Sequence, residues 1–222
     1  MQYLIIGLGN IGPEYERTRH NIGFMVLDRL VAKQGSEQFK LDKQAFFART
    51  MHKGRILNLI KPTMYMNLSG KAVRYWMQHL KIPKENILVI TDDLAIPYGA
   101  LRLKGKGSGG GHNGLGNIQE VLNSTEYPRL RFGIGDKFAQ GKQIDYVLGN
   151  FSIEEQQDLD LNIERAVDAI FQFCSIGLER AMNVVNTKEP KEPKPPKEPK
   201  APKPSKDTPI EAPIDQSAEP QA

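Results

Sequence analysis

Three stretches of the chain hold polar side chains of types that could do chemistry. The first contains Asn10 and His20, the second Asn67, and the third the pair Asp92-Asp93. A histidine exchanges protons near neutral pH, a carboxylate can orient its ring, and an asparagine amide offers two donor hydrogens and an acceptor. These residue types predict a site that moves a proton and holds a polar substrate, provided that the fold brings the three stretches together.

The glycines around Asn10 admit a second interpretation. Gly7, Gly9 and Gly12 follow an apolar run and match the dinucleotide-binding pattern G-x-G-x-x-G. That fingerprint needs a helix that starts within the glycines, because the helix amino terminus holds the pyrophosphate. Here Pro13 follows the third glycine, and the helical pattern begins only near residue 20. The sequence therefore disfavours a nucleotide-dependent oxidoreductase.

Regular elements of alternating type must position these stretches. Apolar residues three or four apart predict helices at 21–33, 66–80 and 115–122, one from the capping box of Ser152 and Glu155 onward, and a last one ending near Asn186. Short apolar or alternating runs predict strands at 3–8, 45–51, 55–60, 86–91, 100–103 and 129–134. The alternation predicts an α/β domain, with the polar stretches at the carboxyl ends of the strands, where sites of such sheets lie.

Composition divides the chain into two parts. The 222 residues suffice for one domain with a core, and the net charge of +4 belongs entirely to residues 1–187. Residues 188–222 hold ten of the fifteen prolines, no aromatic residue and seven lysines against seven acids, so we expect a disordered tail. This tail is either a solvated appendage or a loose electrostatic contact with RNA or the ribosome.

The expected cellular setting follows from features that the sequence lacks. The single cysteine, Cys174, allows no internal disulfide and indicates a reducing compartment. No apolar run reaches the roughly 18 residues of a membrane span, and the first residues lack the pattern of a signal peptide. We expect a cytoplasmic protein with no membrane partner, whose positive charge suits a polyanionic partner.

Four motifs together resemble those of the bacterial peptidyl-tRNA hydrolases. They are Gly-Leu-Gly-Asn at 7–10 with Thr-Arg-His-Asn-Ile-Gly at 18–23, Lys-Pro at 61–62 with Met-Asn-Leu-Ser-Gly at 66–70, Asp-Asp at 92–93, and Gly-Gly-His-Asn-Gly-Leu at 110–115. Each motif alone is weak, but the four in the family's order and spacing over residues 1–187 are highly specific. The tail is not part of the family pattern.

The resemblance implies a fold and an activity. It implies a monomeric single domain, 1–187, with a twisted mixed β-sheet flanked by α-helices, which hydrolyses the ester that joins a peptide to the terminal ribose of tRNA. It implies neither a metal nor a cofactor. The four histidines show no metal-ligand spacing, which agrees with this expectation: His20, His52, His79 and His112.

Within the resemblance, the acid–base roles fall to His20 and Asp92. An ester at neutral pH needs a better nucleophile than water, and His20 is suited to take a proton from that water. Asp92 would accept a hydrogen bond from the other ring nitrogen, fix the tautomer and stabilise the imidazolium, as in a hydrolase triad with water in place of serine. The family pattern places the functional acid at the first residue of the pair, not at Asp93.

Substrate contacts are implied for three asparagines, Asn10, Asn67 and Asn113, whose amides suit peptide groups and the ester carbonyl. Such contacts would help to distinguish peptidyl-tRNA from aminoacyl-tRNA, which carries a charged amine where the first amide should be. Tyr15 and Met66 are expected to line the site.

A glycine-rich stretch, residues 104–114, is predicted to be a mobile gate beside the site, because glycine has little preferred conformation. Within it, His112 either stabilises the substrate or simply packs. A basic strip that could hold the tRNA acceptor stem consists of Arg102, Lys104, Lys106, Arg129 and Arg131. By resemblance, Lys104 and Arg131 are expected to grip the terminal phosphate.

One alternative shares the same scaffold. Some relatives of the family are thought to serve in RNA processing, so a non-catalytic RNA-binding protein is the second hypothesis. The set of Asn10, His20, Asp92 and Asn113 favours the hydrolase. Cys174 lies on the apolar face of a predicted helix, which indicates a core residue and not a nucleophile.

Overall fold

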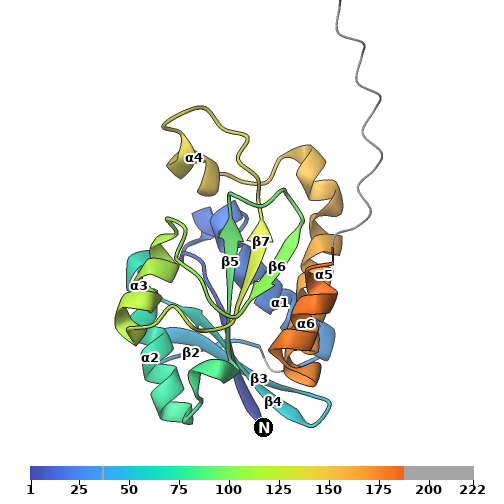
Figure 1. The fold of residues 1–222 in the computed structure, drawn as a ribbon. Coiled ribbons are helices and arrows are strands. Elements are labelled where there is room, and N and C mark those ends of the chain that lie inside the picture. Colours follow the sequence, from blue (N-terminus) through green and yellow to red (C-terminus); the bar gives the residue numbers. More distant parts are fainter. Residues whose placement is uncertain (37, 188–222) are drawn as a thin grey trace, which may run out of the picture. The chain divides into compact units, whose positions relative to one another are not determined.

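A single seven-stranded sheet forms the centre of the protein, in the order β2-β3-β4-β1-β5-β7-β6 (Figure 1). In this computed structural model, residues 1–36 and 38–187 are described. The strands are β1 (Gln2–Gly7), β2 (Lys40–Asp42), β3 (Ala45–His52), β4 (Arg55–Pro62), β5 (Ile87–Asp93), β6 (Leu101–Lys104) and β7 (Arg129–Gly133). Strands β4, β1, β5 and β7 are parallel to their neighbours in this series, while β2/β3, β3/β4 and β6/β7 pair antiparallel.

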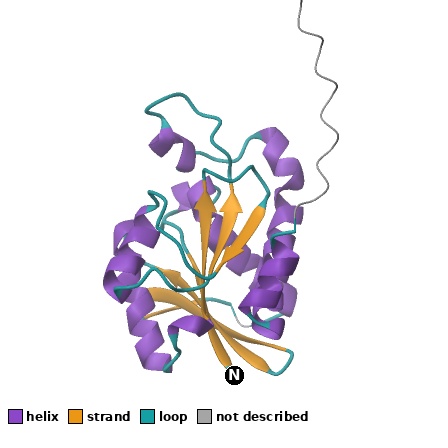
Figure 2. Cartoon of the chain, viewed as in Figure 1, coloured by secondary structure: helices purple, strands orange, loops and turns teal. Residues whose placement is uncertain are grey.

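The sheet is therefore mixed, as predicted, and Figure 2 shows the strand directions turning across it. The helices are α1 (Ile22–Gln34), α2 (Ser69–Leu80), α3 (Asn113–Leu122), α4 (Gln143–Val147), α5 (Ile153–Ile176) and α6 (Leu178–Val185). The short 3-10 turns are η1 (Pro13–Tyr15), η2 (Arg19–Asn21), η3 (Met66–Leu68) and η4 (Lys84–Asn86).

Alternate residues of the central strands feed two hydrophobic cores, one on each face of the sheet. Ile5 and Leu88 pack with α1 and α5 in the first core, whereas Ile6 and Val89 pack with α2 and α3 in the second. Side chains of a strand point alternately to opposite faces, so continuous apolar runs such as Ile87-Leu88-Val89-Ile90 serve both cores at once.

The parallel pairing brings three predicted polar stretches to one edge of the sheet. Ile6 lies opposite Ile60 of β4, and Gly7 lies opposite Ile90 of β5. The segments that follow these residues carry Asn10, Asn67 and Asp92. They emerge at the carboxyl ends of neighbouring strands, where sites in α/β sheets lie.

The glycines of the first stretch serve close packing. A Cβ atom on Gly7 would lie 2.3 Å from the carbonyl oxygen of Gly23, in the first turn of α1. The backbone of the helix thus lies directly on the end of β1, which only a residue without a side chain allows. Since α1 begins at Ile22, well after Gly12, its amino terminus does not follow the glycines as the dinucleotide fingerprint requires.

Most of the predicted elements are confirmed. The β3–β4 hairpin, the capping box of Ser152 and Glu155, and the stop of α1 at Gly35 in the left-handed region all occur. The predicted helix at 66–80 begins with the 3-10 turn η3 before α2. Two elements were not predicted, the exposed edge strand β2 and the five-residue helix α4.

Residues 1–187 form one compact unit. The predicted disordered tail, 188–222, lies outside the described residues. Among the residues that are described, no helix has the length and apolar character to cross a membrane.

Candidate active site

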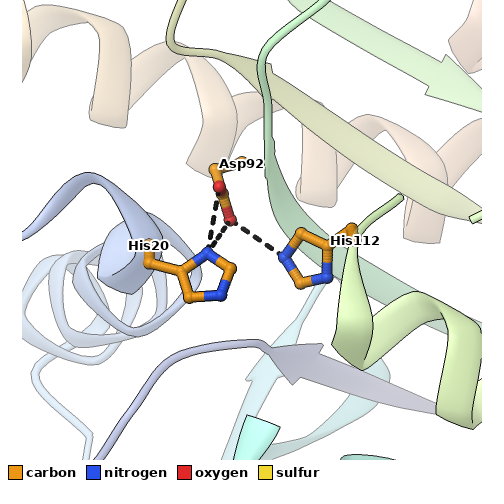
Figure 3. A group of neighbouring side chains, drawn as sticks. All are labelled: His20, Asp92 and His112. Atoms are coloured by element: carbon orange, nitrogen blue, oxygen red, sulfur yellow. Dashed lines mark hydrogen bonds and ion pairs between the residues drawn. The ribbon is translucent and has the colours of Figure 1, made fainter. Parts of the chain in front are cut away.

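His20 and Asp92 meet at the carboxyl edge of the sheet (Figure 3). His20 lies in η2, directly before α1, and its Nδ1 is 3.0 Å from both carboxylate oxygens of Asp92, near the end of β5. An ionised carboxylate only accepts hydrogen bonds, so Nδ1 carries the hydrogen and Nε2 keeps its lone pair. This is the tautomer that a general base requires.

A second histidine binds the same carboxylate from the other side (Figure 3). Nε2 of His112 is 3.0 Å from Oδ1 of Asp92, while its Nδ1 accepts the backbone N–H groups of Gly114 and Leu115 at 3.1 and 3.3 Å. Because Nδ1 accepts, the hydrogen sits on Nε2 and is donated to Asp92. His112 caps α3 and donates to the acid, a role that neither sequence interpretation included.

Burial and hydrogen bonding oppose each other in this cluster. Burial alone favours the neutral imidazole of His20, but the hydrogen bond to Asp92 and the charge of that carboxylate outweigh it and raise the pKa of His20. Burial likewise acts to raise the pKa of Asp92, which is 4% exposed. The charge and hydrogen bonds of the two histidines prevail and hold the pKa of Asp92 well below its ordinary range. Asp92 is therefore a carboxylate at neutral pH.

The neighbouring acid, Asp93, has different partners. Its Oδ2 forms an ion pair with Nε of Arg131 on β7, and its Oδ1 accepts the backbone N–H of Ala95 at 2.9 Å. Asp93 thus holds an arginine and closes a turn, whereas Asp92 contacts both histidines. The two neighbouring acids therefore have different partners, and Asp92 is the one that contacts His20.

Two cavities that share Asn113 contain nearly all of the predicted site residues. The first is lined by His20, Asp92, His112 and Arg131, together with the gate residues 109–111. The second is lined by the other predicted residues, Asn10, Tyr15, Met66 and Asn67. We call them the proton-transfer cavity and the asparagine cavity. The glycine-rich gate does lie beside the site, as predicted.

Asn21 also belongs to this site, although the sequence predicted no role for it. Its Oδ1 accepts the backbone N–H of Asn10 at 2.8 Å, and its Nδ2 donates to the carbonyl oxygen of Asn10 at 2.9 Å. This pair of hydrogen bonds fixes the backbone of Asn10 and involves none of its side-chain atoms. The sequence signal was present, since Asn21 follows His20 in the matched motif.

The short helix α4 supplies a wall that the sequence did not predict. Gln143, Ile144 and Val147 line the proton-transfer cavity together with the gate residues. Five residues of mixed polarity carry too little periodicity to predict a helix. The turn residues Gly141 and Gly149 on either side were the available signal.

The basic strip is only partly where it was expected. Arg129 is 1% exposed and donates to the carbonyl oxygens of Ser108 and Thr125 at 3.1 and 2.9 Å, so its assignment to a surface strip was wrong. It lies in a strand with neighbours on both sides, and its charge holds the base of the gate. In the sheet register, Lys104 of β6 lies opposite Arg129 of β7, which in turn lies opposite Val89 of β5. Val89 is three residues before Asp92, which corresponds to about 10 Å along the strand. Of the predicted site residues, Lys104 alone lines neither cavity.

The same cluster is the group of described residues that comes nearest to a metal site. His20, Asp92 and His112 place potential ligand atoms within 4.8 Å of one another, although their sequence spacing gives no sign of it. A metal ligand must present a lone pair. The nitrogens of His20 and His112 that face Asp92 both carry hydrogens, and Nδ1 of His112 is occupied by two backbone donors. The donor set therefore fits a hydrogen-bonded acid–base cluster and not a cation.

The mixed sheet and the hydrogen-bonded histidine–aspartate pair at its carboxyl edge define a single-domain α/β protein. The family model described as peptidyl-tRNA hydrolase matches residues 4–193. The chain belongs to the peptidyl-tRNA hydrolase family.

Known relatives match over most of their length. The chain is 61% identical over 189 residues to the peptidyl-tRNA hydrolase of Cytophaga hutchinsonii, covering 85% of this chain and all of that one. It is 54% identical to that of Porphyromonas gingivalis over 84% of this chain and all of the relative. The crystal structure of peptidyl-tRNA hydrolase from Acinetobacter baumannii superimposes with a TM-score of 0.78 at 35% identity, covering 83% of this chain and 94% of the other.

Proposed function

We propose that this protein hydrolyses the ester bond between the peptide and the terminal ribose of peptidyl-tRNA, releasing peptide and free tRNA. Membership of the peptidyl-tRNA hydrolase family supports the activity. The observation that carries the mechanism is the contact of His20 Nδ1 with both oxygens of Asp92 at 3.0 Å. That contact leaves Nε2 of His20 as the available base in the proton-transfer cavity.

In the proposed reaction, Nε2 of His20 takes a proton from a water molecule as the water oxygen adds to the ester carbonyl. The imidazolium formed is stabilised by the adjacent Asp92 carboxylate. The tetrahedral intermediate then collapses, the bond from the carbonyl carbon to the ribose oxygen breaks, and that oxygen takes the proton back from His20. The products are a peptide with a carboxyl end and tRNA with a free ribose hydroxyl, and His20 returns to its starting state.

Asn10, Asn67 and Asn113 position the substrate in this proposal. Their side chains line the asparagine cavity, and Asn113 lines the proton-transfer cavity as well. A peptide held by its backbone in the first cavity would present its ester to His20 at the boundary. Amide donors at that boundary would also stabilise the charge that develops on the carbonyl oxygen. Tyr15 and Met66 complete the wall.

The tRNA itself is proposed to approach the side of the site that holds Arg131. Asp93 holds Arg131 through Nε, and the side chain of Arg131 lines the proton-transfer cavity, where its guanidinium could meet a phosphate. Lys104 is exposed at the end of β6, farther from the histidines, and would meet a different part of the acceptor stem. Salt-dependent affinity is expected for such contacts.

Release of free tRNA from N-acetyl-aminoacyl-tRNA tests the activity, with unblocked aminoacyl-tRNA as the comparison. We expect cleavage of the blocked substrate only, and its loss in His20→Ala. Wild-type protein that is folded and binds tRNA but leaves the blocked ester intact would support the RNA-binding alternative instead.

We further propose that the protein acts as a monomer in the cytoplasm, where peptidyl-tRNA arises. For residues 188–222, two roles stay open: a solvated appendage, or a loose electrostatic contact with RNA. Deletion of 188–222 separates them. Unchanged hydrolysis and unchanged salt dependence of tRNA affinity would support the appendage, and a weaker salt dependence would support the contact.

A further inference from the structure

The side chain of Arg19, directly before His20, is buried at the junction of three segments. Arg19 is 7% exposed, and its Nη1 donates to the carbonyl oxygens of Tyr146, Gly149 and Asn150 at 3.3, 3.4 and 2.6 Å. Its Nη2 forms an ion pair with Oε2 of Glu155 at 2.6 Å. The guanidinium carbon lies 4.2 Å from the ring centroid of Tyr146. The two terminal nitrogens of one planar guanidinium thus serve all of these oxygens, while its buried Nε has no hydrogen-bond partner among the described residues.

The backbone on either side of this side chain joins the same segments. The N–H of Arg19 donates to the carbonyl oxygen of Gly149 at 3.0 Å, and Thr18 forms an isolated antiparallel bridge with Asn150. The Glu155 oxygen that pairs with Arg19 also accepts the backbone N–H of Ser152, which caps α5. One residue thus ties η2 to segment 146–150 and to the first turn of α5.

Segment 146–150 begins with the last two residues of α4, the helix whose Gln143, Ile144 and Val147 line the proton-transfer cavity. The guanidinium of Arg19 therefore joins the turn that carries His20 to α4, which lines the same cavity, and it adds to the backbone contacts of Thr18 and Arg19. Loss of that group would leave the half-buried Glu155 without its cation and would remove one donor from each of three carbonyl oxygens, of which those of Tyr146 and Gly149 keep a backbone donor.

We propose that Arg19 is a positioning residue that fixes the distance between His20 and the α4 wall of the proton-transfer cavity. Arg19 contacts neither cavity, and it acts through η2 on one side and through segment 146–150 on the other. The inference rests on the proposed function of His20. A displacement of about 1 Å between a base and its substrate can lower a rate by about 10²-fold, so a clamp at this place controls the chemical step.

The chain provides a matched control in Arg29. Like Arg19, Arg29 joins the α1 region to α5, through Asp160 at 2.6 Å and Glu164 at 3.0 Å, but within the described residues its ion pairs go to α5 alone. Arg19→Met and Arg29→Met each remove one arginine that bridges to α5. Only the first removes the link to α4.

Two measurements on the full-length chain test the clamp, at a temperature at which all variants are folded. For single-turnover hydrolysis of N-acetyl-aminoacyl-tRNA with enzyme in excess and saturating, we expect Arg19→Met to lower the maximal rate about 10- to 100-fold. Arg29→Met should stay within about 2-fold, as a surface ion-pair variant does. For backbone amide exchange of residues 144–150, we expect faster exchange in Arg19→Met and wild-type exchange in Arg29→Met.

Arg19→Lys keeps the inference testable if Arg19→Met does not fold. A lysine can pair with Glu155 but cannot also reach three carbonyl oxygens, so we expect a folded protein with an intermediate rate and faster exchange at 144–150. A wild-type maximal rate in the Arg19 variants, or equal losses in the Arg19 and Arg29 variants, would overturn the proposal. Wild-type protein without hydrolysis would instead overturn the proposed function, and amide exchange would still report on the clamp.

Discussion

The proton-transfer cavity and the asparagine cavity differ in how far the protein satisfies its own polar groups. In the first, Asp92 accepts N–H groups from two histidines, and the second nitrogen of His112 is occupied by backbone donors. In the second, the side-chain amides of Asn10, Asn67 and Asn113 have no hydrogen-bond partner within residues 1–36 and 38–187, and Asn67 and Asn113 are exposed. The first cavity therefore has its hydrogen bonds in place without substrate, whereas the amides of the second have partners still to find.

A buried network must be satisfied in the folded protein, because an unpaired buried polar atom costs about 1–3 kcal/mol. The proton-transfer cavity therefore fixes its tautomers in advance, and its chemistry is ready without the substrate. Exposed amides lose nothing, since water occupies them until a peptide displaces it. The first cavity should accordingly control the rate constant of hydrolysis, and the second should control affinity and discrimination.

The largest expected effect is the loss of the base. His20→Ala should lower the maximal single-turnover rate by about 10²- to 10⁴-fold, the range of general acid–base catalysis, with little change in tRNA affinity. The matched control is His79→Ala, which removes an exposed histidine of α2 that lines neither cavity. Equal rates for the two variants would show that proton transfer in the first cavity does not limit hydrolysis.

Asp92→Asn should cost about 10²-fold or more, because His112 dictates how the new amide turns. With its Nδ1 occupied, His112 must donate from Nε2, so the amide oxygen is held at the position of Oδ1. The amide nitrogen then takes the place of Oδ2, where it competes with the oxygen at Oδ1 for Nδ1 of His20, and the charge that stabilises the imidazolium is lost. Asp93→Asn, which disturbs Arg131, should mainly weaken tRNA binding. A larger rate loss in Asp93→Asn than in Asp92→Asn would reverse the assignment of the acid.

Single changes in the asparagine cavity should be smaller and of another kind. Asn67→Ala removes one amide from an exposed position, which corresponds to about 0.5–1.5 kcal/mol, or roughly 2- to 13-fold, in substrate affinity. We expect the Michaelis constant to rise and the maximal rate to stay nearly constant. Steady-state kinetics with the blocked substrate measures both. A fall of the maximal rate at constant affinity would place Asn67 among the residues that act in the transition state.

The pH profile tests whether the first cavity sets the rate. Only the neutral imidazole of His20 can act as base, and Asp92 raises the pKa of His20 despite burial. Activity should therefore rise with pH through a midpoint above the ordinary histidine value of about 6.5. The acid limb of log kcat/KM against pH gives that midpoint. A midpoint at or below 6.5 would contradict the strong interaction with Asp92.

The two cavities also differ in how much of them could be predicted from the sequence. Strand and helix periodicity placed Asn10, Asn67 and Asp92 at one sheet edge, because parallel strands end together. The four motifs then supplied the residue roles. The contacts of His112 with Asp92 and of Asn21 with Asn10 could not be predicted, since they join side chains whose proximity only the folded turns create.

Burial of charge was the harder prediction. Arg129 and Arg131 alternate with apolar residues, which is typical of a half-exposed strand. In the structure, β7 lies between β5 and β6, and Arg129 is enclosed by the ring of Tyr127 and by the carbonyl oxygens of Ser108 in the gate and of Thr125. The burial of Arg129 depends on the position of its strand within the sheet, which cannot be predicted from the local sequence.

The smallest expected effect is a pH-dependent change in stability, in which His20 is compared with His52. The ring of His52 stacks on Phe171, with 4.0 Å between the ring centroids. Burial lowers the pKa of His52, and the charges of Lys53 and Arg55 lower it further. The pKa of His20 is raised instead. The folded state therefore binds the His20 proton more tightly than the unfolded chain, and the His52 proton more weakly.

The two histidines should consequently change stability with pH in opposite directions. The contribution of His20 is fully present below about pH 6.5 and is lost as pH rises through its raised folded pKa. His20→Ala should therefore reduce the free energy of unfolding more at pH 6 than at pH 9. His52→Ala should reduce the free energy of unfolding more at pH 9 than at pH 6. At low pH the unfolded chain binds the His52 proton more tightly than the native state does, so the wild-type histidine itself destabilises the fold there. Urea unfolding of both variants and the wild type at pH 6 and pH 9 measures the loss of stability in each variant at each pH. If the loss changes with pH in the same direction for both variants, Asp92 does not hold a charged His20 in the native state.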